Sequence, residues 1–320
     1  MDANLKGFRS GLEAAHATNA TVGEGDAAKR GRVTTSSLAE LERAIDADMP
    51  PLARDIILEG ARRLVTYQDM AYARLYLDRL ASVRAADEHA HSSGRLLREV
   101  ARHLAVRMSY EDVIRVAQAK IDPARLARIA ADMGVKPGEP FTVTEFLKPG
   151  IEEMCSLLPP QVARRILALS ERRGWIDRVH WGMEVNSASV SGFLRFWMLA
   201  KLRGWRPKSY RFQEEQRAIE AWLALILEAS RLSEDLALEV AECARLIKGY
   251  GDTWKRGFSN YQTIEARVIV PVLEGRIPPR AGIDAIASAR TAALLDPEGE
   301  GLGRALAAIE AQVTLPLAAE

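Results

Sequence analysis

The sequence predicts an all-α protein: a bundle-like array of many helices with at most one small β-hairpin. Apolar residues recur every three or four positions through most of the chain, as in Ile219, Trp222 and Ile226. This spacing places them on one face of a helix. Signals for helix starts are frequent, whereas the alternating apolar and polar runs of half-buried strands are rare. The fold class therefore follows from periodicity and capping together.

Capping residues mark many of the expected helix starts. Ser37, Ser109 and Thr142 are each followed three residues later by an acid, which is the capping-box spacing. Asp122 stands before Pro123, an N-cap followed by proline at the first helical position. Helices are predicted near residues 36–47, 51–65, 67–86, 93–107, 109–120, 123–133, 143–156, 160–173, 190–203, 212–231, 233–248, 259–270, 279–293 and 300–313.

Strand signals are confined to two places. Val179–Trp181 and Glu184–Asn186 flank Gly182 and are predicted to form a small hairpin. The segment Arg267–Leu273 is a strand candidate only at a sheet edge, because Pro271 has no N–H to donate to a neighbouring strand.

The chain organisation predicted from composition is a tail followed by a helical domain. Residues 1–35 are expected to be an N-terminal tail or linker, since Gly, Thr, Ala and charged residues mix there without a period. Residues 36–320 are expected to form the helical domain. A turn-rich stretch at residues 135–141 is the candidate boundary between two subdomains.

Aromatic residues make up only 6% of the chain, so Leu, Ile, Val and Ala must fill most of the core. The helical stripes predict which side chains are buried. The predicted core contains Leu52, Ile56, Leu64, Leu75, Leu104, Ile114, Ile166, Phe193, Trp197, Ile219, Trp222, Ile226, Val240 and Ile247.

Composition excludes several classes of protein. Apolar residues are 48%, charged residues 27% and the net charge +1, which is the balance of an ordinary globular protein rather than a basic nucleic-acid binder. Cys155 and Cys243 are too few for a four-cysteine zinc or iron–sulfur site, and no metal site is predicted. The longest apolar run has seven residues, whereas a bilayer span needs about 20. With no signal peptide, we expect a soluble cytoplasmic protein that binds neither membrane nor nucleic acid.

A basic and aromatic segment is the first candidate site for an anion or an acidic protein partner. Six cations occur there without an intervening acid, and aromatic residues such as Trp197 lie between them. The alternative is a structural role, with the acids Glu214, Glu215 and Glu220 of the next helix neutralising the charge. The candidate cations are Arg195, Lys201, Arg203, Arg206, Lys208 and Arg211.

A glycine-rich turn is the second candidate anion site. A helix ending at Lys248 would use Gly249 as its left-handed end residue, and the amides of a new helix with two nearby cations would suit an anion. A tight turn with a packed Trp254 is the alternative. The candidate binding residues are Gly249, Gly251, Asp252, Thr253, Lys255 and Arg256, with Trp197, Tyr250 and Trp254 as aromatic pocket candidates.

His180 is the one candidate for acid–base chemistry. It lies beside Trp181 and near Glu184, so it could act as a general base, and the alternative is a hydrogen-bonded histidine in a turn. No complete catalytic motif accompanies it, and no thiamine signature is present.

Four segments together resemble one known family: Val65–Leu80, Gly192–Arg203, Arg211–Trp222 and Glu242–Thr253. They are similar to the C-terminal helical domain, of unassigned function, in long-form indolepyruvate oxidoreductase beta subunits. The resemblance extends from about Ser36 onward. The 2-oxoacid oxidoreductase gamma-like domain of that family does not precede Met1, so the chain is expected to be a fragment, a split subunit or a free-standing relative.

The resemblance implies an assembly rather than a self-contained enzyme. Enzymes of this family oxidatively decarboxylate aryl pyruvates to acyl-CoA and pass electrons to ferredoxin. Thiamine diphosphate, iron–sulfur clusters and CoA are then expected in the partner assembly, and none is expected on this chain. The expected partners are a thiamine-dependent alpha-type subunit and ferredoxin. The family often has His where this chain has Trp254, which argues against proton transfer in that loop.

Two functional hypotheses follow from these features. The first is an accessory or interaction module of an indolepyruvate-type 2-oxoacid:ferredoxin oxidoreductase, not catalytic alone. The second is a free-standing helical protein that binds a small anionic or aromatic ligand, such as a nucleotide, an acyl-CoA or an aryl acid.

Overall fold

The structure, a computed structural model, describes residues 38–89, 93–136, 139–176, 178–249 and 251–314. The predicted tail at residues 1–35 and the predicted cap Ser37 lie outside these residues. Among the described residues, helices dominate and a single two-stranded sheet is present. The predicted mainly α-helical class is therefore confirmed. None of the described helices combines the length and apolarity that crossing a bilayer requires.

The chain divides into two compact units, which we call the middle unit (residues 111–215) and the flanking unit (residues 38–110 and 216–320). The division falls between Tyr110 and Glu111 and again within a long helix, between Glu215 and Gln216. The turn-rich stretch at 135–141, predicted as a boundary, lies inside the middle unit.

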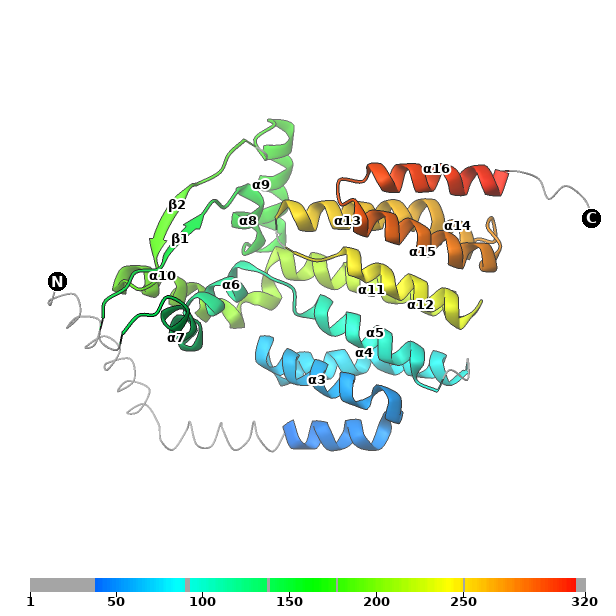
Figure 1. The fold of residues 1–320 in the computed structure, drawn as a ribbon, viewed down its shortest axis with the longest axis horizontal. Helices are drawn as coiled ribbons and strands as arrows, with labels where there is room; N and C mark the ends of the chain where they lie inside the picture. The colour runs from blue at the N-terminus through cyan, green and yellow to red at the C-terminus, as the bar shows by residue number, and fades with distance from the viewer. Residues whose placement is uncertain (1–37, 90–92, 137–138, 177, 250, 315–320) are drawn as a thin grey trace, which may run out of the picture. The chain divides into compact units, whose positions relative to one another are not determined.

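The described residues of the flanking unit form helices and no strand, and Figure 1 shows α3, α4 and α5 lying side by side in it. It begins with a helix at residues 38–48. Its other elements are α3 (Pro51–Tyr67), α4 (Met70–His89), α5 (Arg95–Met108), the later part of α11 (Tyr210–Ser230), α12 (Glu234–Glu242), η3 (Cys243–Leu246), α13 (Asp252–Ile264), η4 (Glu265–Ile269), α14 (Val270–Leu273), α15 (Pro279–Leu295) and α16 (Glu300–Thr314).

The middle unit combines short helices with the sheet. Its elements are α6 (Val113–Lys120), α7 (Pro123–Asp132), β1 (Thr144–Leu147), α8 (Ile151–Ser156), α9 (Pro160–Arg172), β2 (Met183–Asn186), α10 (Val190–Lys201), η1 (Leu202–Gly204), η2 (Arg206–Lys208) and the start of α11. The strands β1 and β2 are antiparallel, with Glu145 opposite Val185 and Phe146 opposite Glu184.

The sheet corrects two predictions. Residues 143–156 are not one helix: β1 comes first and α8 follows, so the expected capping box at Thr142 is wrong. The hairpin around Gly182 is also wrong, because β2 pairs with the distant β1, while His180 forms an isolated bridge with Gly150. Local spacing does not show a partner about forty residues away, and β-branched residues around Thr144 favour a strand there.

The core is predicted in part, and the errors occur in the middle of helices as well as at their ends. Among the predicted core residues, Leu64, Leu104, Ile114, Ile219, Trp222, Ile226, Val240 and Ile247 are buried. Leu52, Ile166 and Trp197 are exposed, contrary to prediction. On α3 a step of four residues turns about 40° beyond a full circle, so Leu52 and Leu64 point about 120° apart. The buried face of α3 instead contains Ala53, Ile57, Ala61 and Leu64.

Two helix starts differ from the capping prediction, and one agrees. Asp112, not Ser109, caps α6, because its carboxylate accepts a hydrogen bond from the Arg115 N–H at 2.6 Å. Asp122 caps α7 as predicted and accepts from the Ala124 N–H at 3.0 Å. The helix expected to begin at residue 259 begins at Asp252.

The strand candidate Arg267–Leu273 is helical. It forms the π-helical turn η4 and then α14, in which Pro271 is the second residue. The wider π turn disrupts the regular ladder of hydrogen bonds at the point where proline has no N–H to contribute.

Candidate functional site

Helix α10 is placed by a cap and a close backbone contact. Ser189 accepts a hydrogen bond from the Gly192 N–H at 3.1 Å at its start. A Cβ atom on Gly192 would lie 2.0 Å from the carbonyl oxygen of Asn186, so only glycine allows α10 this close to the end of β2. On the inner side, Phe196 is buried in a cluster with Ala117 and Val185. The opposite side of α10 is thereby fixed toward solvent.

The solvent-facing side of α10 is apolar, which is the reverse of an ordinary surface helix. Its exposed stripe, the α10 face, consists of Val190, Leu194, Trp197 and Met198, each between 41% and 53% exposed, followed by Lys201. These positions fall at i, i+4, i+7, i+8 and i+11, on one side of the helix. Apolar side chains that gather on a surface are typical of an interaction site.

Cations lie over the aromatic rings of this segment. The Lys201 Nζ atom is 5.0 Å from the Trp197 ring centroid, and the Lys208 Nζ atom is 5.8 Å from the Trp205 ring centroid. Arg195 is exposed on the same helix. Among the described residues no ion pair involves Arg195, Lys201 or Lys208, so their charges are available to a partner.

The other cations of the predicted cluster do not share that surface. Arg206 is fully buried and pairs with Asp112, with Nε to Oδ2 at 2.6 Å. Arg211 pairs with Glu215 at 2.6 Å, and Arg203 is half-buried. The predicted neutralisation by α11 acids thus holds for Glu215. Glu214 contacts Arg164 and Glu220 contacts Arg79 instead.

The glycine-rich turn leads into α13. Gly249 and Gly251 have φ of 82° and 57°, the left-handed region that favours glycine. Gly251 is the N-cap, and neither Asp252 nor Thr253 caps the helix with its side chain. Arg256 pairs with Glu298 at 3.0 Å. Tyr250 lies outside the described residues.

Packing accounts for the remaining features of this turn. Trp254 stacks on Phe258 with the ring centroids 4.9 Å apart. A Cβ on Gly257 would lie 2.1 Å from the Leu246 carbonyl oxygen, so α13 approaches η3 closely. Lys255 is half-buried on the same turn. These contacts match the alternative of a packed helix–helix turn.

The other predicted site residues are dispersed. His180 is exposed, and its side chain makes no hydrogen bond within the described part of the chain. Of the aromatic pocket candidates, Trp197 belongs to the middle unit and Trp254 to the flanking unit. The predicted residues therefore form separate local features.

A partly buried ion-pair network on α5 and α12, with His103 as its buried member, was not predicted from the sequence. One ligand atom each of Glu99, His103 and Glu242 lie within 4.8 Å of one another, a set that could hold a metal ion. Arg102 Nη2 contacts all three: Glu99 Oε2 at 2.5 Å, Glu242 Oε1 at 2.8 Å and His103 Nε2 at 3.1 Å. A guanidinium group thus supplies the positive charge of this cluster. No local signal reveals it, because Glu242 follows His103 by 139 residues.

Acidification is expected to lower the free energy of unfolding of the flanking unit through His103 of this network. Burial lowers the pKa of His103 below its usual 6.5. The unfolded chain therefore takes up a proton near pH 6.5 that the folded chain takes up only at lower pH, so stability falls as the pH drops from 7 toward 5. One such group contributes at most about 1.4 kcal/mol per pH unit. Thermal unfolding of the full chain between pH 5 and 7 measures this slope.

The matched variants are His103→Gln and His89→Gln, since His89 is an exposed histidine on α4. His103→Gln should flatten the slope between pH 7 and 5, and His89→Gln should leave it unchanged. Glu242 releases its proton at a lower pH than His103 does. Burial alone would raise the pKa of Glu242, but hydrogen bonds from His103 and Arg245 and nearby positive charge lower it to about 2. Its contribution is lost only below about pH 4.5. An unchanged slope in His103→Gln would contradict the assignment.

Comparisons with known proteins give a family and no function. The sequence model of DUF6537, a family of unknown function, matches residues 53–267. This range covers more than half of the chain and includes the whole middle unit. No curated protein and no solved structure matches the chain.

Proposed function

The chain belongs to the DUF6537 family, and we propose that it is an accessory docking module of an indolepyruvate-type 2-oxoacid:ferredoxin oxidoreductase. In this proposal the α10 face of the middle unit binds ferredoxin, an acidic electron carrier. Thiamine diphosphate, the iron–sulfur clusters and CoA belong to the partner subunits. The four family-like segments support the assembly, and the exposed α10 face supports the docking role.

The observation that carries the docking role is the combination of uncovered apolar surface and free cations on α10. Leu194, Trp197 and Met198 offer an apolar contact centre, and Trp is enriched at the energetic centres of protein interfaces. Arg195 and Lys201 lie on the same helix and would steer an acidic partner toward it.

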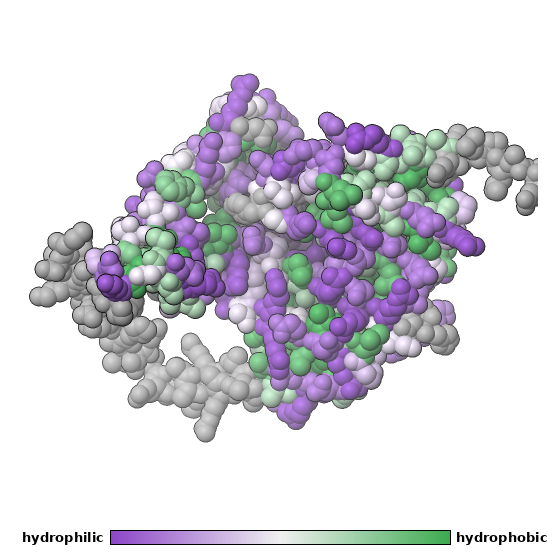
Figure 2. Space-filling model, viewed as in Figure 1, coloured by the Kyte–Doolittle hydropathy of each residue, from purple (hydrophilic) through white to green (hydrophobic). Residues whose placement is uncertain are grey.

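The distribution of exposed apolar side chains also favours the middle unit. Most of the large apolar side chains that are exposed in the described residues lie there, although the most exposed one, Leu295, belongs to the flanking unit. Within the middle unit, Phe146 and Met133 are the most exposed. In Figure 2, green apolar patches interrupt the purple surface over the part that contains β1, β2 and α10, and also over helices of the flanking unit. A unit with this surface is typical of a protein that works in contact with another.

Charge reversal on the α10 segment is expected to weaken ferredoxin binding. The variant is Arg195→Glu, Lys201→Glu and Lys208→Glu in the full chain. Binding to ferredoxin at low salt should weaken by about tenfold or more, and the remaining affinity should depend little on salt, because screening acts on exposed charges. Calorimetric titration at two salt concentrations measures both effects.

A matched control changes the same number of charges elsewhere. Arg231, Arg280 and Arg304 are exposed in the flanking unit, and reversing them to Glu should leave ferredoxin binding intact. A further variant, Trp197→Ala, should weaken binding without changing its salt dependence. If wild-type chain binds neither ferredoxin nor a thiamine-dependent subunit in a native pull-down, the proposed assembly is wrong. If the α10 triple variant binds as tightly as the control, the α10 face is not the dock.

A further inference from the structure

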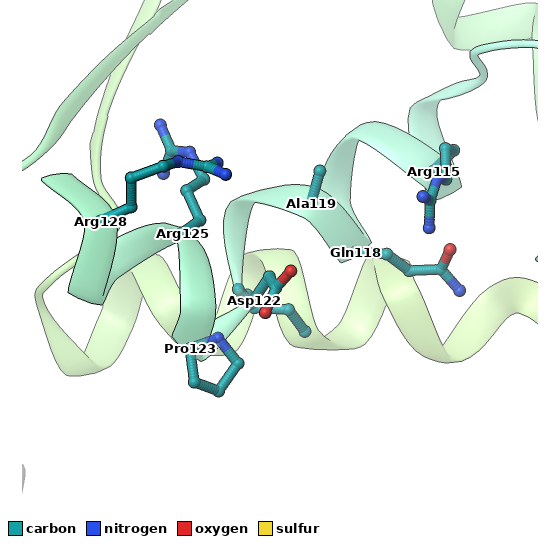
Figure 3. A pocket seen from close by; sticks show the side chains of 8 residues that line it. Arg115, Gln118, Ala119, Asp122, Pro123, Arg125 and Arg128 are labelled. Atoms are coloured by element: carbon teal, nitrogen blue, oxygen red, sulfur yellow. The ribbon is translucent and has the colours of Figure 1, made fainter. Parts of the chain in front are cut away.

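A hollow on the middle unit lies along α6 and α7, away from the α10 stripe in sequence. Its volume is about 440 Å³, within the range of small-molecule sites. Arg115 and Gln118 face it from one side of α6, and Arg125 and Arg128 face it from α7. Both pairs are spaced i, i+3, which places each pair on one helix face. Figure 3 shows Arg115 and Gln118 toward one end of the hollow and Arg125 and Arg128 toward the other.

Arg125 is held in position by the sheet. Its Nη2 atom donates to Glu145 Oε1 at 2.7 Å, and Glu145 is a buried residue of β1 that also pairs with Lys120. The Nη1 atom of Arg125 is buried and has no hydrogen-bond partner. The ion pair with Glu145 therefore fixes this guanidinium group in the wall of the hollow, where its positive charge attracts an oxyanion.

The hollow also has unsatisfied groups beyond Arg125. Arg115 and Arg128 are exposed, and neither forms an ion pair within the described part of the chain. The Gln118 Oε1 atom is buried without a partner, and rotation of that amide would present its NH₂ group instead. An oxyanion beside Arg128 would pair with that exposed side chain, whereas Arg115 and Gln118 lie toward the other end of the hollow.

The charge of the hollow favours an anion despite one acid in its wall. Arg115, Arg125 and Arg128 line it, and Asp122 is the only carboxylate among the described residues that line it. Asp122 already accepts a hydrogen bond from the Ala124 N–H as the cap of α7. Glu145 balances only one of its two partners, Lys120 and Arg125. The cluster as a whole is therefore positive.

We propose that this hollow binds a phosphorylated small molecule, with the phosphate between Arg125 and Arg128 and the organic part toward Gln118 and Arg115. Arginine forks match the oxygens of a phosphate. The volume exceeds what a phosphate ion alone would fill, and Ala119, Ile121 and Pro123 supply an apolar wall for the organic part. The inference goes beyond the docking function and uses different residues.

Calorimetric titration of the full chain at constant ionic strength tests the site with three probes: phenyl phosphate, inorganic phosphate and benzoate. Phenyl phosphate should bind saturably and more tightly than inorganic phosphate, because only it covers the apolar wall. Benzoate should bind more weakly than phenyl phosphate, since a carboxylate has fewer oxygens for the arginines. Equal affinity for phenyl phosphate and inorganic phosphate would overturn the organic part of the proposal and leave a plain phosphate site.

The decisive variants are Arg128→Gln and Arg115→Gln, because both side chains are exposed and unpaired and their loss should not disturb folding. Arg128→Gln should raise the Kd for phenyl phosphate by about tenfold or more, the cost of one charged hydrogen-bonding partner. Arg115→Gln should raise it by a smaller factor.

Arg165→Gln, at an exposed arginine of α9 that lies outside the hollow, is the matched control and should leave the Kd unchanged. Absence of saturable binding by wild-type chain would overturn the proposal. Equal loss in Arg165→Gln and Arg128→Gln would also overturn it, by showing that the anion responds only to net charge. Neither result depends on ferredoxin binding, so the two proposals fail separately.

Discussion

Replacing Arg206 by methionine is expected to destabilise the middle unit by about 3–5 kcal/mol, the usual cost of removing one partner of a buried ion pair. Arg206 is fully buried, and both Nε and Nη2 donate to Asp112, at 2.6 and 3.1 Å. Methionine fills similar space but leaves the Asp112 carboxylate buried without its partner. The loss of stability in this variant therefore measures the cost of an unpaired buried charge, not the loss of a surface contact.

Asp112 makes this ion pair central to the local fold. The same carboxylate caps α6 by accepting from the Arg115 N–H. The pair therefore ties the start of α6 to η2 across 94 residues of sequence. Loss of Arg206 should loosen both ends, and hydrogen–deuterium exchange should show faster exchange in peptides from α6 and η2 before it does so elsewhere.

A double variant separates charge burial from packing. Arg206→Met with Asp112→Asn removes the uncompensated charge and keeps an oxygen for the cap of α6, so it should recover part of the lost stability. Arg195→Met is the matched control, because Arg195 is exposed and its replacement should change stability by less than about 0.5 kcal/mol. Urea unfolding of the full chain measures all three. An Arg206→Met variant as stable as Arg195→Met would show that the ion pair does not hold the unit together.

Arg206 also shows why the candidate site was only partly predictable. In the sequence it is one of six cations in a run without acids, and its acid partner is remote. Periodicity reports which residues share a helix face, but it does not report which face another element covers. The same limit applies to Trp197, which belongs to an apolar stripe and was predicted as core, although the stripe faces solvent.

Helix α10 is an example of a helix whose covered face is not evident from periodicity. Apolar residues occur on both of its sides: Phe196 toward the interior, and Val190, Leu194 and Met198 toward solvent. A helix that is apolar all round is ordinarily buried. Sequence reasoning therefore predicts burial for such a helix, as it does for Trp197, and only the packing partners show that one side of it is uncovered.

The type of fold was predictable because it rests on local properties. Helix periodicity and caps such as Asp122 act within a few residues, so they are visible in the sequence. The errors occur where distant segments decide the outcome. Glu145 was predicted as part of a helical capping box, yet it lies in β1 and contacts Lys120 and Arg125. The hollow between α6 and α7 was not predicted for the same reason, since the distant Glu145 positions Arg125 in its wall.

Replacing Trp222 by alanine is expected to destabilise the flanking unit by about 3–5 kcal/mol, the range for removing a large buried aromatic side chain. Trp222 is fully buried on α11. Its Nε1 atom donates to the Val240 carbonyl oxygen at 3.3 Å, and the Arg107 guanidinium carbon lies 5.1 Å from its ring centroid. One side chain thus connects α11 with α12 and α5. Alanine would leave a cavity at this junction and remove the aromatic face beneath a buried cation.

Two further variants isolate the cause. Trp222→Phe keeps a ring beneath Arg107 and loses the hydrogen bond to Val240, so it should cost less, about 1–2 kcal/mol. Trp181→Ala removes the same side chain from an exposed position and should change stability by about 0.5 kcal/mol or less. Urea unfolding followed by circular dichroism compares the three. Similar losses of stability in Trp222→Ala and Trp181→Ala would mean that the Trp222 ring does not hold α11 in place. A cavity penalty is expected only at the buried site, because at the exposed site water replaces the removed side chain.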